Sequence, residues 1–161
     1  MGGAAQPEPR LAKLAPDVAA YADPAQSIGY LLRLAFRASI QALESRTIIH
    51  GVSSGQWHFL RELWREDGLT QRELSSRAGM REPTTVVAVT KLVEADFVKR
   101  APDANDRRKI HIQLTHKGRD LAPILLPLVA EVNARATAGL TTEEIEALRK
   151  GLRKVCENMS R

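Results

Sequence analysis

The sequence predicts a mainly α-helical protein with one small β-hairpin, on three observations. Apolar residues recur at spacings of three and four along most of the chain, which is the period of an amphipathic helix. Before several of these runs, a Ser or Thr is followed three residues later by Gln or Glu, the capping box that begins a helix. These pairs are Ser53 with Gln56, Thr70 with Glu73 and Thr141 with Glu144. Finally, Ile110, Ile112 and Leu114 alternate with polar residues, as in a half-buried strand.

Composition and charge limit the class of protein. The 161 residues suffice for one domain with a hydrophobic core, or for one domain with helical extensions. Lys and Arg number 24 against 19 Asp and Glu, and the resulting net charge of +5 favours an anionic partner. Nucleic acid is the first candidate and an anionic membrane surface the second. The alternative is a soluble protein that is merely basic.

The sequence carries no targeting signal. No apolar run approaches the ~20 residues of a membrane helix, and the N-terminal stretch lacks the apolar core of a signal peptide. Gln6 stands where a myristoylation motif requires Ser or Thr. The single cysteine, Cys156, cannot form an internal disulfide, which favours a reducing compartment. We therefore expect a cytoplasmic protein.

The first long helix follows an N-terminal segment of different composition. Residues 1–26 are rich in Ala and Pro and are expected to form a flexible or loosely docked arm. Ser27 is a suitable cap for a helix whose apolar residues, from Ile28 to Leu43, follow helical spacing. This helix is expected to end near His50–Gly51.

A second helix is expected directly after it. The capping box at Ser53 precedes Trp57, Leu60 and Trp64, which lie on one stripe of a helix. Asp67–Gly68 is expected to end this helix.

Two shorter helices separated by a glycine come next. The box at Thr70 opens a short helix through Ala78, and Gly79 ends it. Pro83 suits the first position of the following helix, which is expected to run to about Ala95.

A charged hairpin follows these helices. Residues 96–102 ("DFVKRAP") are expected to form a strand that pairs with the alternating stretch from Ile110 to Leu114. The loop between them carries two carboxylates followed by three adjacent cations: Asp103 and Asp106, then Arg107, Arg108 and Lys109. The cations are therefore expected at the tip of the hairpin.

The C-terminal part is expected to be helical. A long helical segment should follow Thr115, with Pro123 in its opening turns and a kink at Pro127. The last helix has an apolar seam formed by Ile145, Leu148, Leu152, Val155 and Met159. A single helix with such a seam requires an apolar partner.

The order of these elements predicts a winged helix-turn-helix. The second of the two short helices fits the major groove of DNA, and a cationic hairpin reaches the neighbouring backbone or minor groove. The expected partner is therefore double-stranded DNA.

Three stretches of the chain resemble the MarR family of bacterial transcription regulators. "DANDRRKIHIQLTHKG" (103–118) is similar to the family's wing signature, with its Asp-x-Arg core and its Leu-Thr-x-x-Gly end. "LTQRELSSRAG" (69–79) resembles the first helix of the DNA-reading pair, and "LVEADFVKR" (92–100) the end of the recognition helix with the first wing strand. The resemblance extends over about residues 28–158.

The resemblance implies an assembly and a mode of control. It implies an obligate homodimer, a palindromic operator and, in many members, a small-molecule effector bound between the dimer helices and the DNA-binding lobes. The expected parts are an N-terminal arm at 1–26, a dimerisation helix at 27–52, a winged helix-turn-helix at 53–115 and C-terminal dimerisation helices at 116–161. A repressor released by its effector is the predicted function.

Two positions depart from the family's pattern. Val87 stands where many members carry an Arg in the second turn of the recognition helix, so base reading is expected to depend on Thr hydroxyls and on methyl contacts with thymine. Asp96 stands where the family tends to have Gly before the first wing strand. Asp tolerates the left-handed backbone conformation better than most residues, so the turn can form.

The predicted DNA-binding residues lie in the recognition helix and the wing. They are Thr84, Thr85, Thr90, Lys91, Arg107, Arg108 and Lys109. Arg107 is the first choice for the minor groove and Arg108 the second, and the alternative is a solvated loop charge. The resemblance implies that Asp106 holds Arg108 and so fixes the shape of the wing, whereas the alternative is an ordinary surface ion pair.

A candidate effector site lies on the first two long helices. It combines aromatic residues with cationic donors, which suits a small aromatic acid. The residues are Tyr30, Arg37, Trp57, His58 and Arg61. The alternative places Trp57 in the core and leaves the Arg residues solvated.

Other functions have weaker support in the sequence. His50, His58, His111 and His116 lack compact ligand spacing, so neither a metal nor another cofactor is predicted. Cys156 lies outside the N-terminal helix that holds the peroxide-sensing cysteine of some family members. The sequence has no phosphate-binding glycine loop, nucleophile elbow or paired catalytic acids, which argues against an enzyme. A winged-helix module that binds protein or RNA without ligand control is the alternative function.

Overall fold

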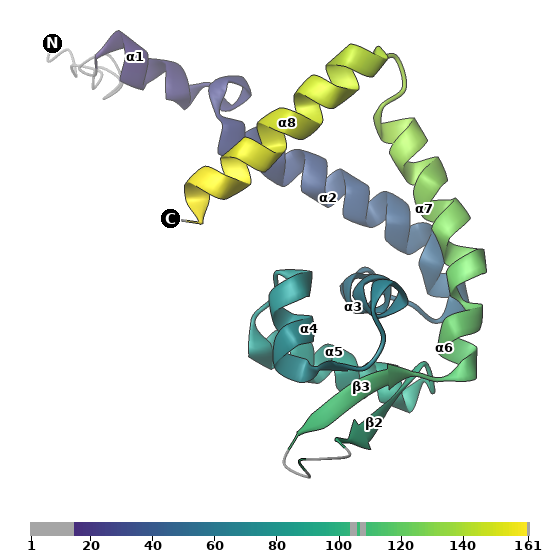
Figure 1. Cartoon of the computed structure of the whole chain (residues 1–161). Helices are drawn as coiled ribbons and strands as arrows, with labels where there is room; N and C mark the ends of the chain where they lie inside the picture. Colours follow the sequence, from purple (N-terminus) through teal and green to yellow (C-terminus); the bar gives the residue numbers. More distant parts are fainter. Residues whose placement is uncertain (1–14, 104–105, 107–108, 161) are drawn as a thin grey trace, which may run out of the picture. The chain divides into compact units, whose positions relative to one another are not determined.

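The computed structural model describes residues 15–103, 106 and 109–160 (Figure 1). It divides into two compact units, one up to Ile40 and one from Gln41 onward, and each is described by itself. The boundary between them falls within helix α2 (Ile28–Thr47).

The first unit consists of short helical turns followed by the first part of α2. Helix α1 (Pro16–Ala19) and two 3-10 turns, at Ala20–Ala22 and Pro24–Gln26, lie in the described part of the segment expected to be an arm. The Ser27 hydroxyl accepts a hydrogen bond from the backbone N–H of Tyr30 at 3.3 Å, which confirms the predicted cap of α2.

The second unit contains six helices after α2 and one small sheet. The helices are α3 (Ser54–Arg65), α4 (Gln71–Ala78), α5 (Glu82–Glu94), α6 (His116–Asp120), α7 (Ala122–Ala136) and α8 (Thr142–Met159). A 3-10 turn at Ile48–His50 joins α2 to Gly51, close to the predicted end of the first helix.

All three predicted capping boxes are present and begin α3, α4 and α8. At the start of α4, the Thr70 hydroxyl accepts from the Glu73 N–H, and the Glu73 carboxylate accepts from the Thr70 N–H at 2.8 Å. Gly79 ends α4 in the left-handed conformation, with φ 64°. Asp96 also has a positive φ, 58°, so the expected tolerance of Asp at this turn is confirmed.

The sheet has three antiparallel strands in the order β1-β3-β2. The hairpin strands β2 (Val98–Pro102) and β3 (Ile110–Leu114) were predicted, and Val98 pairs with Leu114 and Pro102 with Ile110. The third strand, β1 (Leu69–Thr70), was not predicted because two residues are too few to show an alternating pattern. It pairs Leu69 with Ile112 and Thr70 with His111.

The core of the second unit lies between α3, α4, α5, α7 and the sheet. Side chains from each of these elements are almost fully buried: Phe59, Leu60, Leu63, Leu74, Val89, Leu92, Val98, Ile112 and Leu125. The predicted stripe of α3 contributes Trp57 and Leu60 to this core, with Trp64 packed against it. Burial of these residues holds α4 and α5 on the sheet.

Two details of the C-terminal half differ from expectation. The helical segment is interrupted at Leu121, two residues before Pro123, so that α6 and α7 are separate helices. Pro127 lies inside α7, and the kink expected there stays a prediction. Pro123 lacks an N–H and fits the opening turn of a new helix, which explains the place of the break. Ile110 is 41% exposed, so only the second half of the alternating stretch faces the core.

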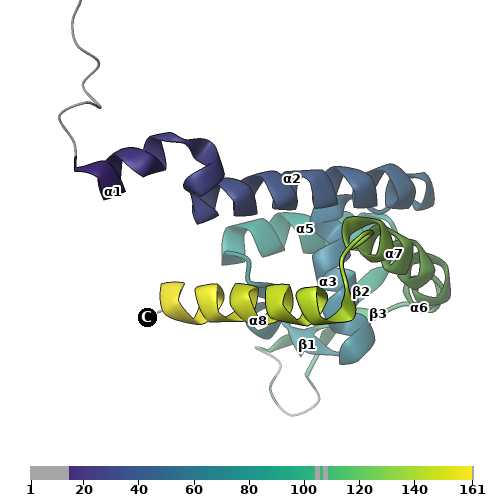
Figure 2. The same ribbon diagram turned by 90° about the horizontal axis from the view of Figure 1, so that it is seen from above.

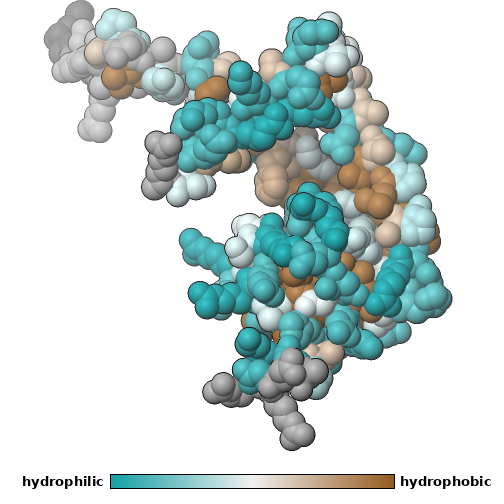
Figure 3. All heavy atoms as spheres, viewed as in Figure 1, coloured by the Kyte–Doolittle hydropathy of each residue, from teal (hydrophilic) through white to brown (hydrophobic). Residues whose placement is uncertain are grey.

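Helix α8 has no buried residue. A turn that contains Gly139, with φ 86°, separates it from α7 (Figure 2). One side of α8 is basic and hydrophilic (Figure 3), whereas Leu148 and Leu152 on the other side are 49% and 39% exposed.

Candidate nucleic-acid interface

The turn between α4 and α5 is fixed by hydrogen bonds at its glycine. The Met80 N–H donates to the Ser75 carbonyl at 3.0 Å, and the Ser75 hydroxyl donates to the Met80 carbonyl at 2.7 Å. Both bonds are possible because Gly79 adopts the left-handed conformation. The turn between α4 and α5 is therefore held by bonds between residues on either side of Gly79.

Thr85 cannot contact DNA, contrary to the sequence-based prediction. Its side chain is fully buried, and its hydroxyl donates to the Arg81 carbonyl at 3.2 Å. Thr85 lies on the same face of α5 as the core residues Ala88, Val89 and Leu92, because α-helical positions three, four and seven apart share a face.

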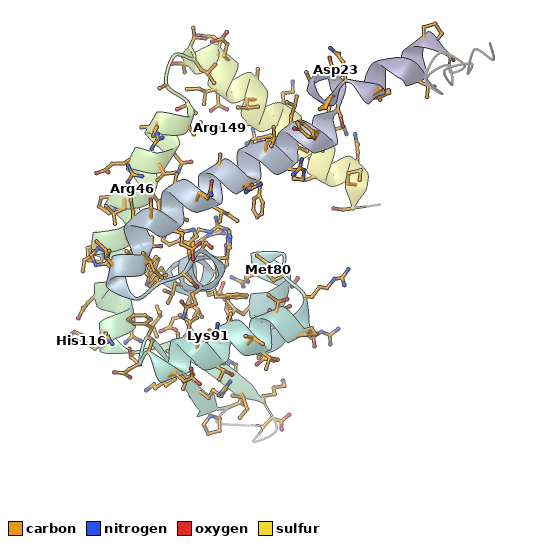
Figure 4. The ribbon with its side chains drawn as sticks, turned by 180° about the vertical axis from the view of Figure 1, so that it is seen from behind. Asp23, Arg46, Met80, Lys91, His116 and Arg149 are labelled. Carbon is orange, nitrogen blue, oxygen red and sulfur yellow. The ribbon has the colours of Figure 1, made fainter. Side chains whose placement is uncertain are left out.

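The exposed face of α5 carries a mixed set of side chains. Thr84 and Lys91, which is labelled in Figure 4, are exposed, and Val86 and Val87 are 43% and 58% exposed. Donors for base edges are therefore few on this helix, and apolar groups occupy much of its outer surface.

Thr90 is half-buried and connects the recognition helix to the sheet. Its hydroxyl donates to the Val86 carbonyl at 2.9 Å and accepts from the Arg100 guanidinium at 3.1 Å. Arg100 lies on β2 and was not among the predicted DNA-binding residues. The sequence signal was its place two residues after Val98, on the same face of the predicted strand and next to a recognition helix with few cations.

A groove of about 500 Å³ lies between the start of α3 and α5. It is lined by Ser53, Gly55, Gln56, Pro83, Thr84, Val87, Ala88 and Lys91. Two of the predicted DNA-binding residues therefore border a largely apolar hollow, whereas none of the predicted effector residues lines it.

The base of the wing is organised by Asp103. Its carboxylate accepts from the Asp106 N–H at 2.9 Å, and its backbone N–H donates to the Lys109 carbonyl at 3.0 Å. The Lys109 N–H in turn donates to the Asp106 carbonyl at 2.8 Å. Lys109 is exposed. Arg107 and Arg108 lie outside the described residues.

His111 connects the wing base to the turn before β1. Its Nδ1 is 2.6 Å from the Gly68 carbonyl oxygen, and its Nε2 is 2.8 Å from Asp103 Oδ2. The hydrogen bond to Asp103 and then that to Gly68 raise the pKa of His111 above its usual value, with further support from the charges of Asp103 and Glu73. His111 was not among the residues predicted to bind DNA or to shape the wing.

Asp67 fixes the other side of the same turn. Its Oδ1 accepts from the Leu114 N–H of β3 at 2.8 Å, and its Oδ2 accepts from the Arg119 guanidinium of α6 at 2.8 Å. The Asp67–Gly68 turn, predicted only as the end of α3, therefore links three elements of the domain.

The predicted effector residues are divided between the two units. In the second unit, Trp57 is buried and packs edge-on against Trp64 at 5.5 Å between ring centroids, which agrees with its assignment to the core. His58 is half-buried, and its pKa is lowered by burial and then by Arg61. Arg61 contacts the buried Glu62, with 3.3 Å between guanidinium and carboxylate.

The first-unit members of this set lie on α2. Tyr30 is half-buried and Arg37 is exposed. The cation over the Tyr30 ring belongs to Arg33, whose guanidinium carbon is 4.9 Å from the ring centroid. Arg33 was not among the predicted residues.

Comparison with known proteins identifies the family. The model for the MarR family matches residues 52–110. A MarR transcriptional regulator from Methanosarcina mazei Go1 has a solved structure that is 30% identical to this chain, with a TM-score of 0.75. The match covers 81% of this chain and 94% of that one. The chain belongs to the MarR family.

Two further relatives agree with the MarR assignment. The HTH-type transcriptional repressor NicR of Pseudomonas putida is 25% identical over 84% of this chain and 86% of its own length. The structure of the PcaV transcriptional regulator from Streptomyces coelicolor is 26% identical, with a TM-score of 0.75, and the match covers 84% of this chain and 95% of that one. This MarR protein is thus a DNA-binding transcription regulator with a winged helix-turn-helix, and its family is one of regulators rather than enzymes.

In residues 15–103, 106 and 109–160, no three metal-binding side chains are grouped together. Over the same part of the chain, no helix has the length and apolar character needed to cross a membrane. Cys156 is exposed on α8.

Proposed function

We propose that the chain is a homodimeric repressor that binds a palindromic operator through two identical winged-helix lobes and is released by a small-molecule effector. The main support is the exposed outer face of α5. This helix belongs to a domain in which hydrogen bonds fix the turn between α4 and α5, the sheet and the wing base. A rigid lobe with one exposed helix suits insertion into the major groove.

The recognition helix reads bases mainly by apolar contact. Val86 and Val87 are exposed, and Thr84 adds a methyl group next to its hydroxyl. These groups favour thymine, whose C5-methyl lies in the major groove. Lys91, Lys109 and the wing cations Arg107 and Arg108 supply phosphate and minor-groove contacts, and Asp106 holds the wing in shape.

The dimer forms through the helices at both ends of the chain. Every residue of α8 is exposed or half-buried, although its seam has the apolar spacing of an interface helix. In the first unit, Ile28, Leu31 and Phe36 of α2 are also exposed. A second copy of the chain would bury both surfaces.

The effector is a small aromatic acid bound near His58 and Arg61 of α3. Arg61 supplies a cation, and burial, followed by the charge of Arg61, lowers the pKa of His58 below its ordinary value. The PcaV relative was crystallised with its natural ligand, and the NicR relative is a repressor.

Selection of genomic DNA fragments by the purified protein tests the proposal. The expected result is enrichment of palindromic sites whose half-sites are about one helical turn apart. Binding to random duplex DNA should be weaker and steeply salt-dependent. Preferential capture of RNA, or enrichment of no DNA site, would contradict the operator and favour a module for RNA or protein.

The effector is tested by titrating Trp fluorescence with a panel of benzoates and cinnamates. Trp57 and Trp64 lie beside His58 and Arg61 in the sequence of α3, so a bound aromatic acid is expected to quench them. Arg61→Gln should weaken that quenching, whereas Lys91→Gln, which alters the groove beside α5, should not. Absence of saturable quenching and unchanged DNA binding at millimolar ligand would exclude an aromatic acid.

A further inference from the structure

The imidazole of His111 lies between two hydrogen-bond acceptors. Nδ1 is 2.6 Å from the Gly68 carbonyl oxygen, and Nε2 is 2.8 Å from the Asp103 carboxylate. Gly68 precedes β1, and Asp103 follows β2, so one side chain from the central strand spans both edges of the sheet.

Only the protonated ring satisfies both contacts. A carbonyl and an ionised carboxylate accept hydrogen bonds, and a neutral imidazole carries a single N–H. Loss of the proton therefore leaves one ring nitrogen facing an acceptor with its lone pair. The imidazolium instead donates two hydrogen bonds. The one to Asp103 joins two charged groups, and such hydrogen bonds are stronger than those between neutral groups.

The charged groups around the ring favour the same state. Asp103 faces it from the wing base and Glu73 acts on it from α4, and both are negative. Asp67, in the turn before β1, directs its carboxylate to the Leu114 N–H and to Arg119. The two hydrogen bonds raise the pKa of His111 above its ordinary value, so the ring keeps its proton to a higher pH than a free imidazole does.

Asp103 makes this contact relevant to the wing. The same carboxylate that accepts from His111 also accepts from the Asp106 N–H, and Asp106 begins the cationic part of the loop. A change at His111 is therefore transmitted to the loop through one side chain.

We propose that His111 is a positioning residue for the DNA-contacting wing, which as an imidazolium ties Asp103 to the Gly68 turn and so sets the direction in which the wing meets DNA. The proposal rests on the DNA-binding function of the domain. It assigns His111 no contact with DNA.

Proton linkage gives the proposal a measurable consequence. DNA is expected to bind the form in which the His111 imidazolium holds Asp103. DNA binding and protonation of His111 are therefore coupled, and each strengthens the other by the same factor. The pKa of His111 is raised in the folded protein, so the paired hydrogen bonds of its imidazolium are present at low pH and are lost as pH rises through that pKa. Affinity for duplex DNA is expected to fall about three- to tenfold between pH 6.5 and 8.5, since one linked proton changes it at most about tenfold per pH unit.

The experiment compares this pH profile between variants at fixed ionic strength, with a random-sequence duplex as the probe. His111→Gln retains a donor for Asp103 but does not titrate, and it should bind with a flatter profile and lower affinity at pH 6.5. His116→Gln is the matched control, because His116 is 92% exposed on α6 and pairs only distantly with Asp120, at 3.5 Å (Figure 4). Its profile should equal that of the unaltered protein. If His111→Gln keeps the original slope and affinity, the proposal is wrong.

A second measurement needs no DNA. Imidazole resonances of the free protein, followed by NMR against pH, should give a pKa for His111 above that of His116. Asp103→Asn should lower it, because the amide carries no charge and presents a weaker acceptor. A His111 pKa at or below the ordinary value, or one that Asp103→Asn leaves unchanged, would contradict the proposed hydrogen bonds of the imidazolium to Asp103 and Gly68. If no duplex is bound at any pH while the NMR result holds, the proposed regulator function fails together with the positioning role, and only these hydrogen bonds stand.

Discussion

Gly118, the last residue of the wing signature, lies against the backbone of Phe97, the residue before β2. Its carbonyl accepts from the Trp64 indole N–H at 2.9 Å, and a Cβ at this position would lie 1.9 Å from the Phe97 carbonyl oxygen. Gly118→Ala should therefore lower the free energy of unfolding by about 1–3 kcal/mol or more, because backbone must move to admit one methyl group. Urea denaturation followed by circular dichroism measures the loss.

Gly55→Ala is the control for this substitution. No atom lies within 4 Å of a Cβ added at Gly55, so stability should stay the same or rise by up to about 1 kcal/mol. Equal stability of the two variants would contradict the close approach at Gly118.

The buried hydroxyl of Thr85 leads to a different prediction from that of its neighbour. Thr85→Ala should cost roughly 1–2 kcal/mol of stability, through a lost hydrogen bond and a small cavity, with the base preference unchanged. Thr84→Ala should keep the stability and alter the base preference. Urea denaturation and selection from a randomised operator library separate the two effects, and a changed base preference in Thr85→Ala would return Thr85 to the interface.

Residues differ in how far sequence alone predicts their role. The capping boxes at Ser53, Thr70 and Thr141 were predictable because the bonded groups are three residues apart, so local geometry decides them. Thr85 was misassigned because its burial depends on which face of α5 packs on α3 and α4. His111 was missed because its partners, Gly68 and Asp103, come from two other parts of the chain.

At the scale of elements, the wing carries the clearest electrostatic prediction. Arg107→Ala should weaken binding to all duplexes alike and reduce the slope of log affinity against log salt by roughly one, as expected for one lost phosphate contact. Fluorescence anisotropy over a salt series measures that slope. Lys150→Ala is the control, because Lys150 lies on the basic side of α8 and the slope should not change. An unaltered slope in Arg107→Ala would remove this residue from the interface.

Element boundaries were predictable where a single residue type decides them. Gly79 and Asp96 end helices in the left-handed conformation, and both positions were anticipated. Strand β1 was not, because its two residues are strand only through their pairing with Ile112 and His111. The break at Leu121 depends on how Pro123 and Pro127 share one helical segment, which their spacing alone does not decide.

At the scale of the whole molecule, the sequence predicts that the helices outside the winged domain have an apolar face, but it does not predict which surface that face contacts. Heptad-like spacing predicts that α8 buries its seam, and the structure leaves every α8 residue exposed or half-buried. Apolar spacing indicates that a surface is buried, but it carries no information about the surface that buries it. The effector set has the same difficulty, because its members lie on both units.

The seam of α8 gives the last prediction, that the free protein is a dimer. Sedimentation equilibrium at micromolar concentration should give about twice the chain mass of 17.8 kDa. Leu148→Asp combined with Leu152→Asp should yield a folded monomer, because burial of each unpaired carboxylate in an interface costs several kcal/mol, and both side chains are now largely exposed. Lys150→Asp places a carboxylate on the opposite side of α8, and this variant should remain a dimer. Because a palindromic site is read by two lobes, the monomeric variant should also lose operator affinity while it keeps weak, salt-dependent binding to random duplex DNA. A monomer in the unaltered protein, or a dimer that survives both Leu substitutions, would place the interface away from α8.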